Sequence, residues 1–155
     1  MPTNKLAALA LAAAVAAVAT FAYAQDVTPD PSLASLSPEE MVAKRQAVMK
    51  EDGGILKGAG ALSGPEAVTA AEHLIQNFTN LSVLFPEGTL VGDTEALPVI
   101  WEKNDEFQAI FATAVANATA MKAAAEAGDA DAYMAAIKAT GGVCGQCHQT
   151  FRKPS

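Results

Sequence analysis

The sequence predicts an all-α fold, an antiparallel four-helix bundle, and three observations lead to this prediction. Four segments place apolar residues at the three-and-four spacing that forms one face of a helix. The connections between these segments are much shorter than the segments themselves. No stretch alternates apolar and polar residues over more than a few positions, as a half-buried strand would.

Two segments precede the predicted bundle. Residues 1–24 combine Lys5, a long Ala/Leu/Val run and an Ala-Tyr-Ala end, which is the pattern of a secretory signal peptide cleaved after Ala24. Residues 25–37, with Pro29 and Pro31, are expected to form an extended lead-in. No other stretch is apolar enough to cross a membrane, so the pattern predicts a soluble protein of the periplasm.

The bundle domain is predicted over residues 38–155, and start and stop signals separate its helices. The first helix begins at Ser37-Pro38-Glu39-Glu40, with serine as cap, proline in the first turn and acidic residues after it. The second follows Ser63-Gly64-Pro65-Glu66, carries its apolar face to Phe85 and is stopped by Pro86. The third runs from near Pro98 to about Gly128. The fourth follows Asp129 and carries its face to Phe151.

The composition excludes several classes of protein. A net charge of −7 and the absence of Lys/Arg runs argue against nucleic-acid binding, which needs a positive surface. Two cysteines are too few for a disulfide-rich scaffold or for a zinc site built from four thiolates.

The residues that carry chemistry are Cys144-Gly145-Gln146-Cys147-His148, the C-x-x-C-H signature for attachment of haem c. On a helix both thiols lie on one face, so each can form a thioether with one vinyl group of the same porphyrin. His148 then lies where its imidazole can bind the iron. The alternatives are weaker, because a thioredoxin-like pair needs a βαβ context, a disulfide here would close a very small loop, and zinc would need a fourth ligand. One covalent, iron-containing haem c near the C-terminus is therefore expected.

The position of the motif at the end of a helical chain resembles the class II c-type cytochromes, the cytochrome c′ family. Three other pieces match in order: Arg45-Gln46-x-x-Met49-Lys50, Leu84-Phe85-Pro86-x-Gly88-Thr89, and Pro98-x-Ile100-Trp101 with Phe107. The resemblance covers nearly the whole chain after the leader. It implies a four-helix bundle with one haem, and often a homodimer formed through the first two helices.

The resemblance also implies a distal position on the first helix, one turn after an arginine. In gas-binding members this position holds a non-ligating side chain and the iron is five-coordinate, whereas a second branch has a methionine and a low-spin, six-coordinate iron. Four residues after Arg45 comes Met49, so the chain is most like the Met/His-ligated branch. Met49 also lies on the apolar face, and a thioether opposite histidine is an established haem ligand. The alternatives are a space-filling core methionine, or ligation by Met41 instead.

Arg45 lies on the inward face of the first helix, where a buried guanidinium needs an anion. A haem propionate offers one, and Gln46 is expected near the same edge. The alternatives for Arg45 are a partner such as Asp52 or a side chain that extends to solvent.

Together these residues predict a periplasmic monohaem electron carrier with His148 and Met49 as iron ligands, and not an enzyme. Its partners would be redox proteins that bind transiently and present a basic patch to its acidic surface. The alternative is a five-coordinate cytochrome c′ that binds nitric oxide or carbon monoxide.

Overall fold

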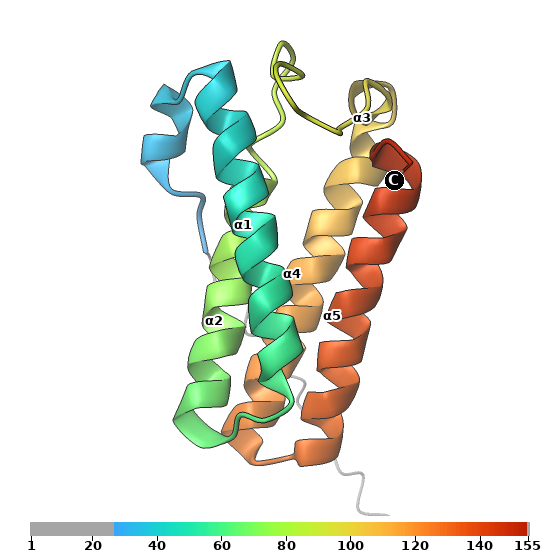
Figure 1. Ribbon diagram of the computed structural model, residues 1–155. Helices are drawn as coiled ribbons and strands as arrows, with labels where there is room; N and C mark the ends of the chain where they lie inside the picture. Colours follow the sequence, from blue (N-terminus) through green and yellow to red (C-terminus); the bar gives the residue numbers. More distant parts are fainter. Residues whose placement is uncertain (1–26, 155) are drawn as a thin grey trace, which may run out of the picture.

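The computed structural model describes residues 27–154, and the predicted signal peptide lies outside them. Four long helices run antiparallel: α1 (Pro38–Ala59), α2 (Gly64–Leu81), α4 (Asn104–Ala127) and α5 (Ala130–Phe151), with a single-turn α3 (Val99–Glu102) before α4 (Figure 1). The described residues contain no strand, only one isolated bridge between Ala96 and Arg152. The predicted all-α four-helix bundle is confirmed.

The helix starts follow the local signals in the sequence. The Ser37 side chain accepts a hydrogen bond from the Glu40 amide while the Glu40 carboxylate accepts one from the Ser37 amide, a complete capping box at α1. Asp129 caps α5 by accepting from the Ala132 amide at 2.9 Å. Between α4 and α5, Gly128 adopts φ 67°, a left-handed conformation that glycine tolerates without strain.

Three local expectations differ from the structure. Residues Pro31–Ser35 of the lead-in form a short 3-10 helix, η1, where an extended chain was expected; Asp30 caps it, and Leu33 inside it is buried. The second helix ends at Leu81, earlier than expected, because Pro86 disfavours helical backbone before it and a tight turn takes over. Leu84 and Phe85 still reach the core from that turn, so the apolar periodicity outlasts the helix.

The third predicted helix is divided in two. Lys103, at φ −118° and ψ 42°, leaves helical geometry between α3 and α4. The indole Nε1 of Trp101 donates to the carbonyl of Phe85 at 3.0 Å, which ties α3 to the turn after α2.

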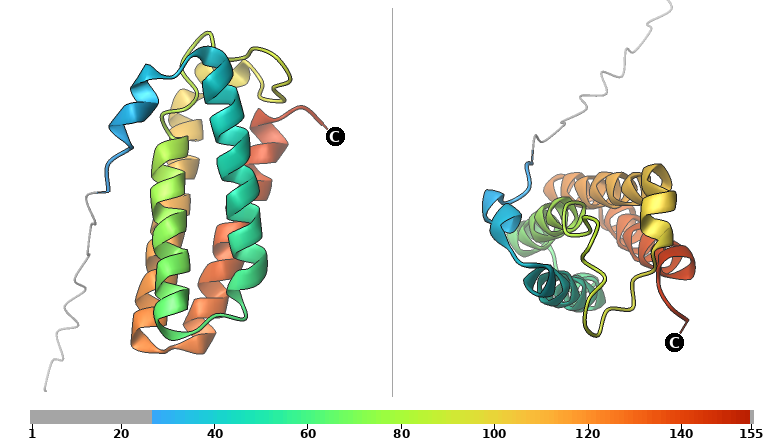
Figure 2. Two further views of the ribbon diagram at one scale, coloured as in Figure 1. Left: turned by 60° about the vertical axis from the view of Figure 1, so that its left-hand side comes forward. Right: turned by 90° about the horizontal axis from the view of Figure 1, so that it is seen from above.

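The core joins three of the four long helices more closely than the fourth. α4 packs along both α2 and α5, whereas α1 packs mainly on α2 and meets α5 at few points. At one end of the bundle Phe107 makes edge-to-face contacts at 5.0 Å with three other phenylalanine rings, Phe85, Phe111 and Phe151. Seen along the bundle axis, the connection from α2 to α3 crosses this end between α1 and α5 (Figure 2).

Within residues 27–154, none of the helices is both long and apolar enough to span a bilayer.

Two methionines provide a matched test of this core. Met121 is fully buried, whereas Met134 is 50% exposed. We expect Met121→Ala to lower the free energy of unfolding by about 2–5 kcal/mol, because it leaves a cavity in a packed interior. Met134→Ala should change it by less than about 0.5 kcal/mol. Urea titration followed by circular dichroism measures both, and equal losses would contradict the assigned packing.

Candidate haem site

The C-x-x-C-H residues lie in the last two turns of α5, and two cavities meet beside them. The larger, of about 310 Å³, is lined by residues of α1, α5 and the segment between α2 and α4, and the smaller, of about 180 Å³, reaches further into the bundle. Both are lined by Met49, Cys147 and His148, so the two cavities adjoin. Cys144 lines the smaller one. They lie between α1 and α5, which pack together less closely than α1 does with α2, α2 with α4 or α4 with α5.

The ionisation of the motif residues follows from their surroundings. Burial raises the pKa of Cys147 to about 11, with a further contribution from Cys144, and burial also raises the pKa of Cys144. The pKa of His148 lies below its ordinary value because nearby protein atoms desolvate the ring and Arg152 adds a positive charge. At neutral pH the site therefore presents neutral thiols and a neutral imidazole, the form of histidine that can bind a metal.

The wall opposite α5 comes from α1. Met49 is half-buried and lines both cavities, whereas Met41 lines neither of them. Met49 is thus the methionine of α1 that the structure brings together with His148.

Arg45 is buried, 2% exposed, and its guanidinium makes four hydrogen bonds to the segment after α2. Nη1 donates to the carbonyl of Leu84 and the hydroxyl of Thr89, and Nη2 donates to the carbonyl of Thr89 and the hydroxyl of Thr94, at 2.8–3.1 Å. The guanidinium carbon also lies 4.5 Å from the centre of the Phe85 ring. All four acceptors are neutral, so the positive charge of Arg45 at the cavity wall has no carboxylate partner among the described residues.

Asp52, the other partner considered for Arg45, pairs elsewhere. Its Oδ1 accepts a hydrogen bond from Nδ2 of Asn77 on α2 at 2.8 Å. The sequence offered Asp52 as an alternative partner for Arg45 and contained no signal for Asn77 as the partner of Asp52.

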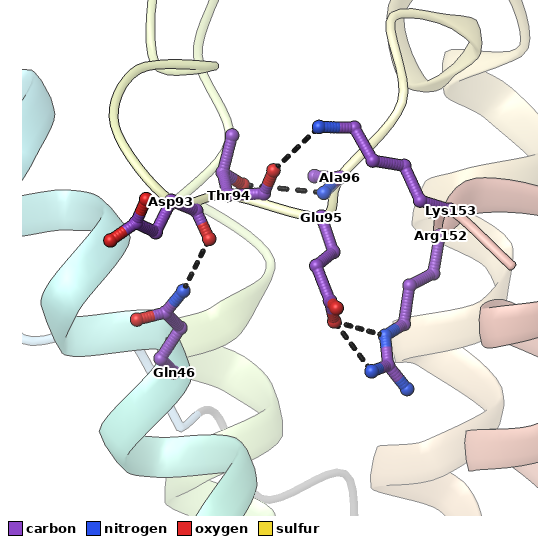
Figure 3. Close-up of polar contacts among 7 residues, drawn as sticks. All are labelled: Gln46, Asp93, Thr94, Glu95, Ala96, Arg152 and Lys153. Carbon is purple, nitrogen blue, oxygen red and sulfur yellow. Dashed lines mark hydrogen bonds and ion pairs between the residues drawn. The ribbon is translucent and has the colours of Figure 1, made fainter. Parts of the chain in front are cut away.

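A strap formed by residues 93–97 crosses the cavity end and is fastened on both sides (Figure 3). On the α1 side, Nε2 of Gln46 donates to the carbonyl of Asp93 at 3.3 Å. On the α5 side, Arg152 pairs with the Glu95 carboxylate, with Nε to Oε2 at 2.7 Å, and Nζ of Lys153 donates to the carbonyl of Thr94 at 3.0 Å. Backbone hydrogen bonds from Leu97 to Phe151 and from Lys153 to Glu95 complete the attachment.

A helical bundle whose last helix turns two thiols and an imidazole toward a mainly apolar cavity has the construction of a c-type haem protein. Comparison with known proteins names the family. Residues 40–152 match the family model described as cytochrome c′. The chain belongs to the cytochrome c′ family.

Individual relatives agree. The chain is 37% identical over 124 residues to a cytochrome c′ of Pararhodospirillum photometricum, covering 76% of this chain and 99% of that one. It is 37% identical over 120 residues to a cytochrome c-556 of Agrobacterium tumefaciens, covering 72% and 95%. Among solved structures, a nitric oxide complex of a mutant cytochrome c′ from Alcaligenes xylosoxidans superposes with a TM-score of 0.69 at 25% identity, covering 77% and 98%.

Proteins of this family carry one covalently attached haem c with iron, and this is the cofactor of the chain. The residues present fit it, because the adjoining cavities bring together an apolar wall, both thiols, the imidazole and an arginine without a carboxylate partner. When bound, the haem supplies an iron that is reduced and oxidised by one electron.

Replacing Arg45 tests its role in holding the strap end of the molecule. We expect Arg45→Met to cost about 2–4 kcal/mol of unfolding free energy, since it leaves buried Thr and carbonyl oxygens without donors. Amide hydrogen exchange at Leu97 and Lys153 should accelerate. Lys44→Met is the matched control, because Lys44 is the exposed neighbour. Exchange as slow in Arg45→Met as in the control would show that the strap does not depend on the guanidinium.

Proposed function

We propose that the chain is a monohaem electron carrier in which Cys144 and Cys147 hold the haem as thioethers and His148 and Met49 bind its iron. The observation that carries this proposal is the pairing of Met49 with His148 along both adjoining cavities, from two helices that otherwise touch little. A thioether opposite histidine favours the reduced iron and leaves no open position for a substrate. The protein therefore transfers electrons and is not a typical enzyme.

Arg45 and Gln46 are proposed to hold the propionate edge. A guanidinium has five N–H groups, and four of those of Arg45 are used by the segment after α2. The remaining one, on Nε, is available to a propionate, and the uncompensated positive charge favours an anion at this wall. Gln46 lines the same cavity, with its amide bound to Asp93.

Location and partners complete the proposal. The leader pattern of residues 1–24 supports export to the periplasm, the compartment in which haem c is attached. Transient redox partners with a basic docking patch suit a chain of net charge −7. A homodimer through α1 and α2 is proposed from the family resemblance.

A second candidate function is supported by the comparisons. The names of the relatives and structural neighbours agree better with a cytochrome c′ whose iron is five-coordinate and binds nitric oxide or carbon monoxide, and one neighbour is described as a nitric oxide complex. The two functions differ in what Met49 does. If its sulfur stays off the iron, the distal cavity is open to a diatomic gas.

The attachment residues are tested by exchanging sulfur for oxygen. We expect the double variant Cys144→Ser/Cys147→Ser to lose covalent haem, because a hydroxyl does not form the thioether. Haem staining of denaturing gels measures this directly. Gln146→Ser is the control, since Gln146 is exposed and lies between the two cysteines without supplying a thiol. Haem retention in the double variant equal to that of Gln146→Ser would refute attachment at this motif.

The distal ligand is tested by absorption spectroscopy of the oxidised protein. We expect a low-spin spectrum with a near-infrared sulfur-to-iron charge-transfer band, which Met49→Leu abolishes while producing a high-spin spectrum. Met41→Leu is the matched control, a half-buried methionine of the same helix outside both cavities. A wild-type spectrum that is already high-spin, and that Met49→Leu leaves unchanged, would replace the electron carrier with the gas-binding candidate.

A further inference from the structure

The wall of the smaller cavity contains a buried carboxyl group that is only half satisfied. Asp52 is 3% exposed. Its Oδ1 accepts from Asn77 at 2.8 Å, but its Oδ2 is buried and has no hydrogen-bond partner within the described part of the chain. A buried carboxylate oxygen without a donor is costly, whereas a protonated carboxyl carries less charge to desolvate. The surroundings therefore favour the neutral acid.

Few charged groups face Asp52 from the packed helices. α2 contributes the uncharged Asn77, and α4 contributes apolar side chains such as Ile110 and Phe111. α5 contributes Cys144, Cys147 and His148, and on its own helix the neighbouring charge is Glu51. Thioether formation removes the thiol protons and iron binding occupies the imidazole. Of the described residues that line this cavity, Asp52 then remains the one that can exchange a proton.

The energetics place this exchange in the physiological range. Burial raises the pKa of Asp52 to about 7, the Asn77 hydrogen bond opposes the rise, and Glu51 adds to it. A haem in the adjoining cavities would displace water from the same wall and keep the carboxyl desolvated. The charge of an iron held by neighbouring residues acts strongly on such a group, because the local dielectric constant is low.

We infer that Asp52 binds a proton when the haem iron gains an electron and releases it when the iron is oxidised, so that the chain moves a proton together with each electron. The step balances: iron(III) takes one electron from the redox partner and becomes iron(II), while the carboxylate takes one proton from solvent and becomes the acid. Oxidation reverses both changes. This inference rests on the proposed haem attachment, but it holds for either distal coordination.

The sign of the effect follows from the charges. The carboxylate stabilises the more positive, oxidised iron, so the midpoint potential falls as pH rises and Asp52 ionises. If one proton is taken up with each electron, the equilibrium constant for reduction changes tenfold per pH unit. This equals a change of about 59 mV in the midpoint potential of a one-electron couple. Below the transition, with Asp52 neutral in both redox states, the potential levels off at its higher value.

The test is spectroelectrochemical titration of the full-length holoprotein between about pH 5 and about pH 9. We expect the wild-type potential to fall with pH near neutrality, and Asp52→Asn to remain at the acid plateau of the wild type throughout. Asparagine keeps the acceptor for Asn77 and nearly the same shape. Glu51→Gln is the matched control, because it removes the adjacent but exposed carboxylate and should keep the wild-type slope. The same slope in Asp52→Asn as in wild type overturns the inference.

A second measurement uses the wild-type protein alone, so it does not depend on whether a variant folds. Redox-difference infrared spectra of the wild type should show the carbonyl stretch of a protonated carboxyl appearing on reduction at neutral pH. A pH-independent wild-type potential together with no such band also overturns the inference. In both cases the covalent haem and its visible spectrum remain as proposed, whereas a protein that lacks covalent haem would overturn the proposed function itself.

Discussion

The burial of one guanidinium organises the haem end of this bundle. Arg45 cannot lose its proton and cannot reach bulk water, so it requires oxygen acceptors, and the segment after α2 supplies four of them from Leu84, Thr89 and Thr94. The need to provide acceptors for the N–H groups of Arg45 therefore determines the path of that segment. Once it runs there, residues 93–97 lie within reach of the end of α5, where Glu95 meets Arg152. The shape of the cavity mouth depends on these linked requirements.

Local signals predicted the elements well, and long-range contacts explain the rest. The caps at Ser37 and Asp129 act within one turn, so they can be recognised in sequence. Phe85 continued the predicted apolar face although the helix had ended, because burial depends on where a side chain points and not on backbone type. The proximity of Met49 to the C-x-x-C-H residues could be expected, because both lie on the inward faces of their helices. The acceptors of Arg45 lie 39 to 49 residues away in a loop with no periodicity, so no sequence pattern indicated them.

Two buried ionisable residues on one face of α1 have their hydrogen-bonding groups satisfied to different extents. Arg45 and Asp52 lie two turns apart on α1 and do not pair with each other. Arg45 has donors matched by neutral oxygens and keeps its charge, whereas Asp52 has one oxygen matched and one without a partner. The wall of the two cavities is thus positive toward the strap and carries the half-satisfied carboxyl group of Asp52 deeper in the bundle. Such a gradient supports the proposal that the propionates of the haem lie toward Arg45 and its apolar body toward the interior.

The unequal packing of the helices has a mechanical consequence. The thiols and His148 belong to the closely packed part of the bundle, because α5 packs on α4, and α4 on α2. Met49 belongs to α1, which has few contacts with α5 and packs on α2 and on the strap. A small displacement of α1 would therefore change the distance between Met49 and His148 across the adjoining cavities while leaving the main core intact. One side of the cavities is therefore fixed by the main core, whereas the position of the other side, α1, depends on its contacts with the strap. These contacts, from Arg45 to Thr94 and from Gln46 to Asp93, set the distance between α1 and α5.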